Sequence, residues 1–299
     1  MSESPALLAV FGNPIAHSLS PLIHQFFAQQ EGRSIIYEKR LVEGAFADCA
    51  REFFAQGGVG CNVTVPCKVE AFNFATAKTE RARVAQAVNT LSVRHDADGS
   101  LSYKGDNTDG FGLLTDLLRL KCPLASARVL IIGAGGATRG IVPSLQSLGC
   151  IHSLTIVNRT LAKAEEIIAS IQDFYAANRF SRALMPMRAY DYAALEAQKV
   201  TPDTYFDVII NATSLSMSEE LPPVKDEYYK RARFAYDLFY TPQGKTVFTE
   251  HAKSLGIANS YDGLGMLVGQ AALAYEQWFG VRPEMEPTIE YMRQVLAQR

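Results

Sequence analysis

The chain has 299 residues, of which 48% are hydrophobic, and its formal net charge at pH 7 is −2. This length predicts two domains, and the composition allows each of them to bury a core. The sequence shows no excess of basic residues that would favour nucleic-acid binding. It also shows no apolar run long enough to cross a membrane and no N-terminal secretory signal. Its 5 cysteines and 5 histidines lack the spacing of a disulfide framework or a metal site. We therefore expect a cytoplasmic globular protein with no metal, no nucleic-acid partner and no membrane partner.

Short apolar runs and amphipathic stretches alternate over the N-terminal third of the chain. The expected strands are 7–11, 35–39 and 60–68, the expected helices are 22–30 and 45–56, and a hairpin turn is expected at Asp98-Gly99. Ser20 and Pro21 predict the N-cap and the first position of the first helix. Pro66 is expected to end its strand and to leave Lys68 at the strand's C-terminal end, where open α/β sheets bind ligands.

The polar features of this region each allow two interpretations. Ser20 can be a helix cap alone, or Ser18 and Ser20 can present their hydroxyls at a positively polarised helix end as a seat for a small carboxylate. Lys68 can be a solvated surface charge or a residue of a ligand site. The polar run 106–109 can be a solvated loop or the rim of a cleft.

A buried strand runs into a glycine turn in the middle of the chain. Val129–Ile132 are four β-favouring apolar residues, and an amphipathic helix pattern follows from Arg139 to Leu148. A strand, a glycine turn and a helix predict the first unit of a dinucleotide-binding fold, in which backbone N–H groups approach a pyrophosphate. The match to G-x-G-x-x-G is imperfect because Thr138 takes the third slot, while Gly136 adds room.

Strands and helices continue to alternate after this turn. Further strands are expected at 154–157, 184–187, 208–210, 234–236 and 257–258, and further helices at 192–198, 246–255 and 267–279. This alternation predicts a doubly wound parallel sheet.

The end of the strand at 154–157 indicates which dinucleotide binds. NAD-specific folds carry an acidic residue about 20 positions beyond the glycines, where it bonds the ribose 2′-hydroxyl. This chain has Asn158 and Arg159 there, with Lys163 one helical turn further. An arginine matches a phosphate and a carboxylate would repel it, so the sequence predicts NADP rather than NAD.

Motifs from Val10 to about Gly280 together resemble those of the shikimate dehydrogenase family. In chain order they are VFGNPIAHSLSPLIH, NVTVPCK, AVNTL, GDNTDGFG, GAGGATRG, VNRT, NATS, YDLFY and DGLGMLVGQAA. The glycine turn and NATS are common patterns. The combination of NVTVP-x-K, N-T-D-G and a C-terminal G-M-L-x-x-Q is highly specific.

The resemblance implies a two-domain α/β fold. Residues 1–108 and 263–299 would form a mainly parallel substrate-binding domain, and residues 109–262 would form a doubly wound Rossmann domain for NADP. The implied activity is an oxidoreductase that interconverts 3-dehydroshikimate and shikimate, a step toward aromatic amino acids. We expect a small-molecule substrate and a monomer or homodimer.

The resemblance also implies roles for individual residues. Lys68 and Asp109 would be catalytic, with Lys68 exchanging the hydroxyl proton and Asp109 orienting Lys68. The substrate would be bound by Ser18, Ser20, Thr64, Lys68, Asn89, Asp109, Tyr240 and Gln270, with the two serines on its carboxylate. NADP would be bound by Gly133, Ala134, Gly135, Gly136, Ala137, Asn158, Arg159, Thr160, Lys163, Thr213, Leu238, Gly263 and Glu80.

Three residues, Gln25, Ser216 and Gly269, depart from the family's usual pattern, which bears on loop geometry and cofactor fit rather than on the reaction. Two rival functions stay open. One is a broader enzyme that also oxidises quinate and uses NAD. The other is a non-catalytic ligand-sensing homologue, which would be expected to lose the Lys68 and Asp109 pair. The aromatic residues Tyr37, Phe53, Phe54 and Trp278 are expected to serve packing.

Overall fold

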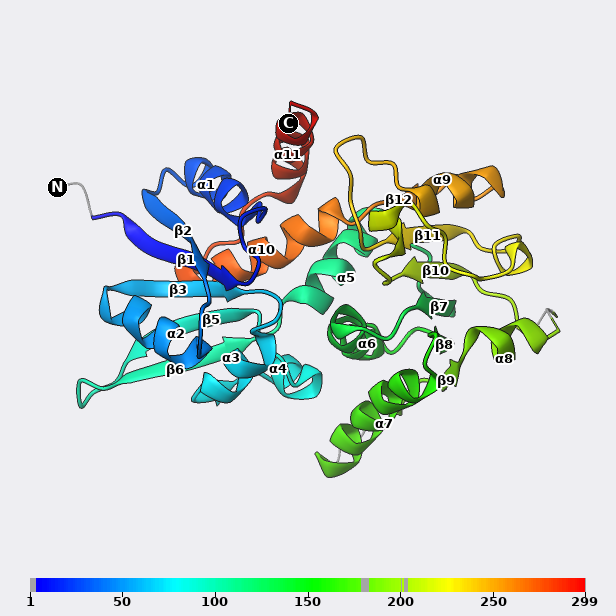
Figure 1. Ribbon diagram of the computed structural model, residues 1–299, viewed down its shortest axis with the longest axis horizontal. Coiled ribbons are helices and arrows are strands. Elements are labelled where there is room, and N and C mark those ends of the chain that lie inside the picture. Colours follow the sequence, from blue (N-terminus) through cyan, green and yellow to red (C-terminus); the bar gives the residue numbers. More distant parts are fainter. Residues whose placement is uncertain (1–3, 179–182, 200, 202–203, 299) are drawn as a thin grey trace. The chain divides into compact units, whose positions relative to one another are not determined.

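The computed structural model describes residues 4–178, 183–199, 201 and 204–298. It divides the chain into two compact units, which can be followed by colour in Figure 1. The first unit consists of Met1–Gly112 and Leu267–Met292, and the second of Leu113–Met266 and Arg293–Arg299. Each unit is built on one β-sheet, because each has its own set of alternating apolar strands.

The first unit contains a six-stranded sheet in the order β2-β1-β3-β5-β6-β4. Its strands are β1 (Ala6–Gly12), β2 (Ile35–Leu41), β3 (Gly58–Val63), β4 (Ala77–Lys78), β5 (Thr90–His95) and β6 (Leu101–Asp106). Strand β1 pairs in parallel with β2 and β3, whereas β5 pairs antiparallel with β3 and β6. The turn predicted at Asp98-Gly99 is confirmed, since it joins β5 to β6 and Gly99 has a φ of +82°.

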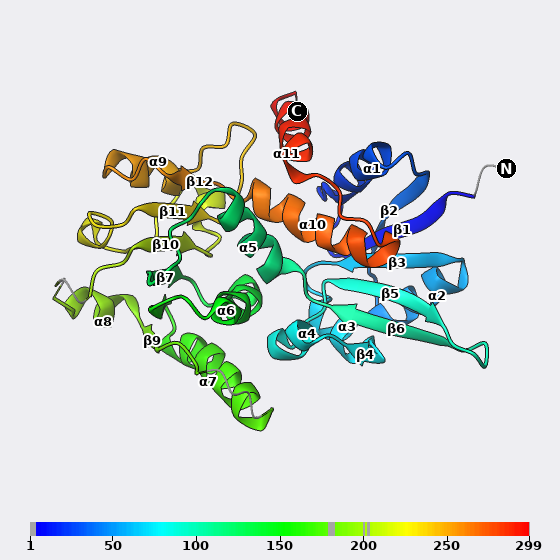
Figure 2. The same cartoon turned by 180° about the vertical axis from the view of Figure 1, so that it is seen from behind.

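The alternation of side chains along β1 gives the first sheet two packed faces. Four helices lie entirely in this unit: α1 (Ser20–Gln30), α2 (Phe46–Ala55), α3 (Lys68–Phe74) and α4 (Glu80–Ala85). Helices α5 (Asp109–Arg119), α10 (Leu264–Phe279) and α11 (Met285–Ala297) have residues in both units. Phe11 packs with Phe46 and Phe53 of α2, whereas Val10 faces the other side with Trp278 of α10. Figure 2 shows these helices and the sheet from behind.

The predicted packing aromatics lie in these two layers. Tyr37, Phe53 and Phe54 are buried, and Trp278 is partly buried, with Nε1 donating to the Leu91 carbonyl at 3.0 Å. Gly60 on β3 makes room for this indole, because an added Cβ would lie 2.2 Å from Trp278 Nε1. The expectation that these residues serve packing is therefore confirmed.

The second unit contains an all-parallel sheet in the order β12-β11-β10-β7-β8-β9. Its strands are β7 (Arg128–Ile132), β8 (Ser153–Val157), β9 (Met187–Tyr190), β10 (Val208–Asn211), β11 (Phe234–Asp237) and β12 (Ser260–Tyr261). The strand order reverses between β7 and β10, and ligands bind at such a switch point in doubly wound sheets.

Helices connect these strands and cover their apolar side chains. They are α6 (Gly136–Leu148), α7 (Leu161–Ala177), α8 (Tyr192–Ala197) and α9 (Val247–Ser254), with short 3-10 helices at Leu215–Ser218 and Asp226–Tyr228. On one face of the sheet, Leu130 and Ile209 pack with Tyr229 and Phe248. Strands β7, β8, β10 and β11 are almost entirely buried, which explains their nearly continuous apolar sequences, whereas the edge strand β9 is partly exposed.

The start of α1 differs from the prediction. Leu19 is the N-cap residue and Ser20 is already the first helical residue, so the prediction of Ser20 as N-cap is wrong. Leu19 has helical dihedral angles (φ −90°, ψ −6°), and the helix therefore starts one residue earlier. The Ser18 hydroxyl receives the Ser20 N–H at 3.3 Å and replaces the missing side-chain cap.

The predicted strand 60–68 is also wrong at its C-terminal end. Strand β3 ends at Val63, and Cys67 N–H closes a turn on the Thr64 carbonyl at 3.0 Å. Lys68 consequently begins helix α3 rather than ending a strand.

Two strands of the second unit are shifted relative to the prediction. The strand expected at 184–187 begins only at Met187, because Pro186 has no N–H to give to a sheet ladder. The strand expected at 257–258 lies instead at Ser260–Tyr261, because Ile257 N–H bonds the Ala252 carbonyl and closes the end of α9.

Candidate active site

Lys68 and Asp109 lie together in the first unit although 41 residues separate them. Lys68 Nζ donates to Asp109 Oδ2 at 2.5 Å, and the two side chains are 28% and 13% exposed. Each residue is the first of its helix, α3 or α5. A carboxylate at the first turn of α5 is favoured by the helix dipole. The geometry places a proton donor and a fixed anion side by side, at a site that solvent or a ligand can still reach.

Asn89 fixes the second oxygen of this carboxylate. Its Nδ2 donates to Asp109 Oδ1 at 2.8 Å and to Thr108 Oγ1 at 2.9 Å. Its Oδ1 accepts the Thr108 N–H at 2.8 Å, which settles the orientation of the amide. Asn89 is 2% exposed and precedes β5, so it is held by the sheet. Asp109 therefore has one oxygen on Lys68 and the other on Asn89.

Gln270 comes to the same cluster from helix α10. Its Oε1 accepts from Asn89 Nδ2 at 3.5 Å, and its Nε2 donates to the Leu267 carbonyl at 2.9 Å. Helices α5 and α10 approach closely here, because a Cβ on Gly112 would lie 2.6 Å from Gln270 N. Gly269, one of the departures from the family pattern, has the same role, since its added Cβ would meet the Gly112 carbonyl oxygen at 2.8 Å.

Ser18, Ser20 and Thr64 follow the ends of β1 and β3. Ser18 Oγ donates to Ser20 Oγ at 3.2 Å, at the N-terminus of α1. Thr64 N–H donates to the Phe11 carbonyl at 2.8 Å, which places the residue beside β1. The structure thus brings the two serine hydroxyls together at a helix end, as expected for a carboxylate seat.

A buried side chain of β3 that the sequence analysis did not single out, Asn62, is hydrogen-bonded to residues of α1 and β2 and to the residue before β5. Asn62 Oδ1 accepts from Tyr37 Oη at 2.7 Å and lies 3.0 Å from His24 Nε2, while its Nδ2 donates to the Asn89 carbonyl at 3.3 Å. Burial lowers the pKa of His24 to about 3, against the opposing effect of its hydrogen bond to Asn62. The signal in the sequence was an amide inside a predicted buried strand, because such a group needs partners.

The predicted pyrophosphate turn lies between β7 and α6 of the second unit. Gly133 has a φ of +108°, and an added Cβ there would meet the Ala212 backbone at 3.0 Å. Cβ atoms built on Gly135 and Gly136 meet no heavy atom within 4 Å, so the backbone at the start of α6 faces open space. Thr138 is buried and donates to the Gly133 carbonyl at 2.9 Å. Thr138, the residue that departs from the glycine motif, therefore closes the turn through this hydrogen bond.

Residues after β8 border this turn. Asn158 Oδ1 accepts the Ala134 N–H at 3.2 Å, and its Nδ2 donates to the Thr160 carbonyl at 2.9 Å. Thr160 is the N-cap of α7, and Arg159 and Lys163 are exposed. Both amide atoms of Asn158 serve the loop itself, which leaves the two cations as the charged groups at the end of β8.

The remaining predicted cofactor residues of this unit follow β10 and β11. Thr213 Oγ1 donates to Asn211 Oδ1 at 2.7 Å, and Leu238 N–H donates to the Asn211 carbonyl at 2.9 Å. A Cβ on Gly263 would lie 2.2 Å from the Leu238 carbonyl oxygen, so this position accepts only glycine. Asn211 thus joins the segments that carry Thr213 and Leu238, and Gly263 packs against Leu238.

Ser216, another departure from the family pattern, is buried here and donates to Asp237 Oδ2 at 2.6 Å. Burial raises the pKa of Asp237 despite this hydrogen bond and others. The third departure, Gln25, is an exposed residue of α1.

Two predicted residues belong to a different unit from the sets with which they were grouped. Tyr240, predicted with the substrate residues, lies in the second unit beside Phe239, with ring centroids 6.2 Å apart. Glu80, predicted with the cofactor residues, is the first residue of α4 in the first unit.

Within the described residues, no group of three histidine, cysteine, aspartate or glutamate side chains is placed to hold a metal ion. The helices in that same part of the chain are too short or too polar to cross a membrane.

Comparisons with known proteins identify the family. The model of the shikimate dehydrogenase substrate binding domain matches residues 10–91, that of shikimate / quinate 5-dehydrogenase matches 116–199, and that of the shikimate 5'-dehydrogenase C-terminal domain matches 263–297. The chain is 44% identical to "Shikimate dehydrogenase (NADP(+))" of Cellvibrio japonicus over 98% of this chain and 99% of the relative. The chain belongs to the shikimate dehydrogenase family.

Solved structures of similar proteins share the complete fold. An Ael1 enzyme from Pseudomonas putida is 38% identical, with a TM-score of 0.80 over 96% of this chain and 97% of that one. Shikimate 5-dehydrogenase from Thermus thermophilus, solved in complex with NADP(H) and shikimate, is 27% identical, with a TM-score of 0.78 over 97% of this chain and 100% of that one. The predicted family, enzyme class and two-domain α/β fold are confirmed.

Proposed function

We propose that this enzyme catalyses the reversible NADPH-dependent reduction of 3-dehydroshikimate to shikimate, a step in the formation of aromatic amino acids. The observation that carries the proposal is the Lys68–Asp109 pair at 2.5 Å, held by Asn89, in a chain of this family. A non-catalytic ligand sensor has no need of a proton donor fixed in this way. A neighbour of the same fold was solved with NADP(H) and shikimate, which supports the substrate and the cofactor.

The two domains that the sequence predicts would have different roles. Residues 1–108 and 263–299 would bind the substrate, and residues 109–262 would bind NADP. Ser18 and Ser20 would hold the substrate carboxylate through their hydroxyls and the N-terminus of α1. Thr64, Asn89, Asp109 and Gln270 would hold the ring and its hydroxyls.

Lys68 would handle the proton at the reacting oxygen. In the reductive direction its ammonium can donate a proton to the carbonyl oxygen, and in the oxidative direction its amine can accept one from the hydroxyl. Asp109 Oδ2 holds the ammonium in position, and Asn89 prevents the carboxylate from turning away. The nicotinamide supplies the hydride chemistry when NADP is bound.

The second unit offers places for both the pyrophosphate and the 2′-phosphate of NADP. The open space at Gly135 and Gly136, at the N-terminus of the 13-residue helix α6, suits a pyrophosphate. Arg159 and Lys163 would bind the 2′-phosphate of the adenosine ribose, because both are exposed cations beside this turn. Ala134, Ala137, Asn158, Thr160, Thr213, Leu238 and Gly263 would complete the NADP site of this unit.

An absorbance assay at 340 nm tests this function directly. Shikimate and quinate are each combined with NADP and with NAD, and the four values of kcat/KM are compared. We expect shikimate with NADP to give the highest value. A higher value with quinate, or no turnover with either alcohol, would contradict the proposal.

Two further properties belong to the same proposal. We infer that the enzyme works in the cytoplasm, because its five cysteines are free thiols. It would act as a monomer or a homodimer, which light scattering during gel filtration can test.

A further inference from the structure

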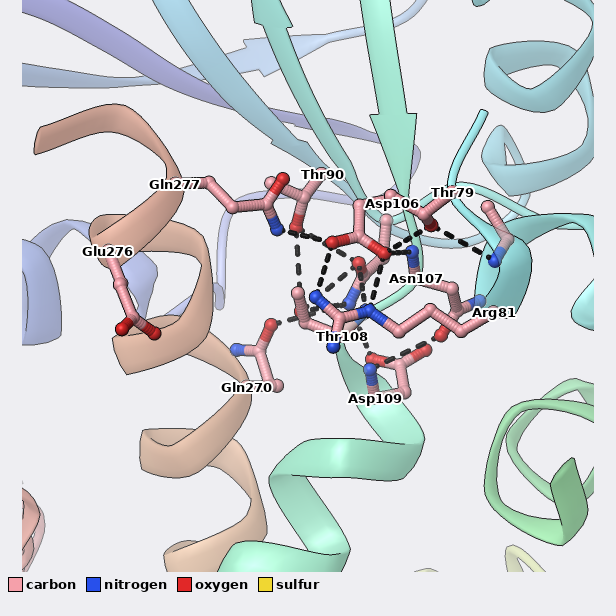
Figure 3. A network of polar contacts seen from close by, with 12 residues as sticks. Thr79, Arg81, Thr90, Asp106, Asn107, Thr108, Asp109, Gln270, Glu276 and Gln277 are labelled. Atoms are coloured by element: carbon pink, nitrogen blue, oxygen red, sulfur yellow. Dashed lines mark hydrogen bonds and ion pairs between the residues drawn. The ribbon is translucent and has the colours of Figure 1, made fainter. Parts of the chain in front are cut away.

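The carboxylate of Asp106, at the end of β6, is buried among donors from two helices (Figure 3). Arg81 of α4 donates from Nε to Oδ1 at 2.6 Å and from Nη2 to Oδ2 at 2.5 Å. Thr79, the N-cap of α4, donates to Oδ1 at 2.6 Å, and Gln277 Nε2 of α10 donates to Oδ2 at 2.5 Å. The carboxylate side chain is 1% exposed, so water does not compete for these hydrogen bonds.

Asp106 carries its negative charge in this buried place. Burial raises the pKa of the carboxyl, but Arg81, Thr79 and the Asn107 N–H outweigh burial, and the pKa of Asp106 lies below its ordinary value. Replacement of a buried ion pair by apolar side chains of similar volume often costs no stability. We infer that the charged Asp106 serves to hold its hydrogen-bond donors in fixed positions and not only to stabilise the fold.

Short links lead from Asp106 to two of the proposed site residues. The Asp106 carbonyl accepts the Asn89 N–H at 2.9 Å. Asn107 N–H donates to Asp106 Oδ1 at 2.7 Å, and Asn107 Oδ1 accepts the Asp109 N–H at 3.2 Å. Asp106 therefore holds Asn89 through its backbone carbonyl, and its carboxylate holds Asp109 through Asn107.

A third link runs through helix α10. Gln270 and Gln277 are seven residues apart and so lie on the same face of the helix. Gln277 bonds Asp106, while Gln270 Oε1 accepts from Asn89 Nδ2 at 3.5 Å. In Figure 3 both glutamines join the network, whereas the neighbouring Glu276 does not. The bond of Gln277 thus ties the helix that carries Gln270 to Asp106.

We propose that Arg81, Asp106 and Gln277 form a positioning cluster that sets Asn89, Asp109 and Gln270 for the substrate. The proposal deepens the proposed function and rests on it. Two different kinetic effects follow, because the cluster contacts the site at two places. Gln277 acts through Gln270 and affects substrate binding, whereas Asp106 lies on the Asp109 loop and also affects the proton-handling pair.

The test compares Gln277→Met, Asp106→Asn and the control Glu276→Gln. Glu276 lies on the same helix but pairs with Arg282 at 2.6 Å in exposed positions. We expect Gln277→Met to raise the KM for shikimate about tenfold with kcat changed less than about twofold. Asp106→Asn should lower kcat about 10²-fold, since small displacements at reacting groups have effects of this size. The KM for NADP should stay unchanged in all three variants.

Arg81→Lys and Arg81→Met separate positioning from folding. Lysine keeps the charge beside Asp106, so Arg81→Lys should recover part of the kcat that Arg81→Met loses, when both are assayed at a temperature at which each variant is folded. Hydrogen exchange gives a readout independent of activity: the Asn89 and Asp109 amides should exchange at least about tenfold faster in Asp106→Asn, with β8 amides unchanged.

The possible failures are distinguishable. If the unmodified enzyme does not turn over shikimate, the proposed function is wrong. The hydrogen-exchange rates of the Asn89 and Asp109 amides in Asp106→Asn would then test the cluster by themselves. Normal wild-type turnover with unchanged kinetics in Gln277→Met and Asp106→Asn would overturn the cluster alone. A parallel rise in the KM values for shikimate and NADP would also overturn it.

Discussion

The ammonium of Lys68 lies 2.5 Å from Oδ2 of Asp109, and Asn89 Nδ2 lies 2.8 Å from the other oxygen of the same carboxylate. Lys68 and Asp109 begin two separate helices, so their pairing depends on how α3 and α5 meet the first sheet. A carboxylate held from both sides cannot rotate freely. It keeps the ammonium in one place, as proton transfer to a bound substrate requires.

Removal of the ammonium should affect turnover more than binding. We predict that Lys68→Ala lowers kcat by about 10²–10⁴-fold, because a positioned acid–base group contributes this much, with a modest change in KM. Steady-state kinetics with shikimate and NADP measure both parameters. Lys253→Ala, at an exposed lysine of α9, is the control. Wild-type kcat in a folded Lys68→Ala protein would exclude Lys68 from the chemistry.

The pair should act as a unit. The double variant Lys68→Ala/Asp109→Asn should lose less activity than the product of the two single losses, because either change alone already disrupts the pair. Fully multiplicative losses in kcat would show that the two side chains act independently.

Arg159 should distinguish the two dinucleotides. We predict that Arg159→Ala raises the KM for NADP at least about tenfold and leaves the KM for NAD nearly unchanged, because only NADP carries the 2′-phosphate. Arg188→Ala, at an exposed arginine of β9, is a matched control. Equal effects of Arg159→Ala on both cofactors would contradict the assignment.

The serine pair should recognise charge on the substrate. Ser18→Ala and Ser20→Ala should each weaken the binding of shikimate about tenfold, since hydrogen bonds to a charged group are lost, while a carboxamide analogue loses less. Inhibition constants for the acid and the amide measure this difference. Ser34→Ala, at an exposed serine of the same unit, should change neither constant. If acid and amide lose affinity equally, the carboxylate binds elsewhere.

His24 should make the fold sensitive to acid. Its pKa is about 3 in the folded chain against 6.5 for an exposed histidine, so between these values the unfolded chain binds a proton that the folded chain excludes. The stability is fully present above pH 6.5 and falls as the pH drops, by up to about tenfold in the unfolding constant per pH unit. Urea unfolding at pH 7.5 and pH 5.5 measures this slope.

His24→Gln should be less stable at pH 7.5, because it loses the aromatic stacking on Tyr37, yet its stability should depend less on pH. His152→Gln, at an exposed histidine, should keep the wild-type slope. The assignment fails if His24→Gln and the wild type lose stability in parallel between the two pH values.

Predictions from local sequence were reliable where a residue type has a strong preference for one backbone conformation, such as glycine in a turn with positive φ. The run Val129–Ile132, the turn at Gly133 and the hairpin at Asp98-Gly99 all follow from such preferences, and each is present in the structure. Errors arose at the ends of elements. The start of α1, the end of β3 and the positions of β9 and β12 depend on competing hydrogen bonds that the sequence does not display.

The sequence by itself determined the family, the two α/β units and the residue types available for chemistry, because periodicity and motifs are local properties of the chain. Only the tertiary structure decided which of those residues meet. Lys68 with Asp109, Asn89 with Gln270, and Asp106 with Arg81 and Gln277 are neighbours through the packing of α3, α4, α5 and α10 around one sheet. Contacts between distant parts of the chain depend on the free energy of the whole fold, which no short stretch of sequence contains.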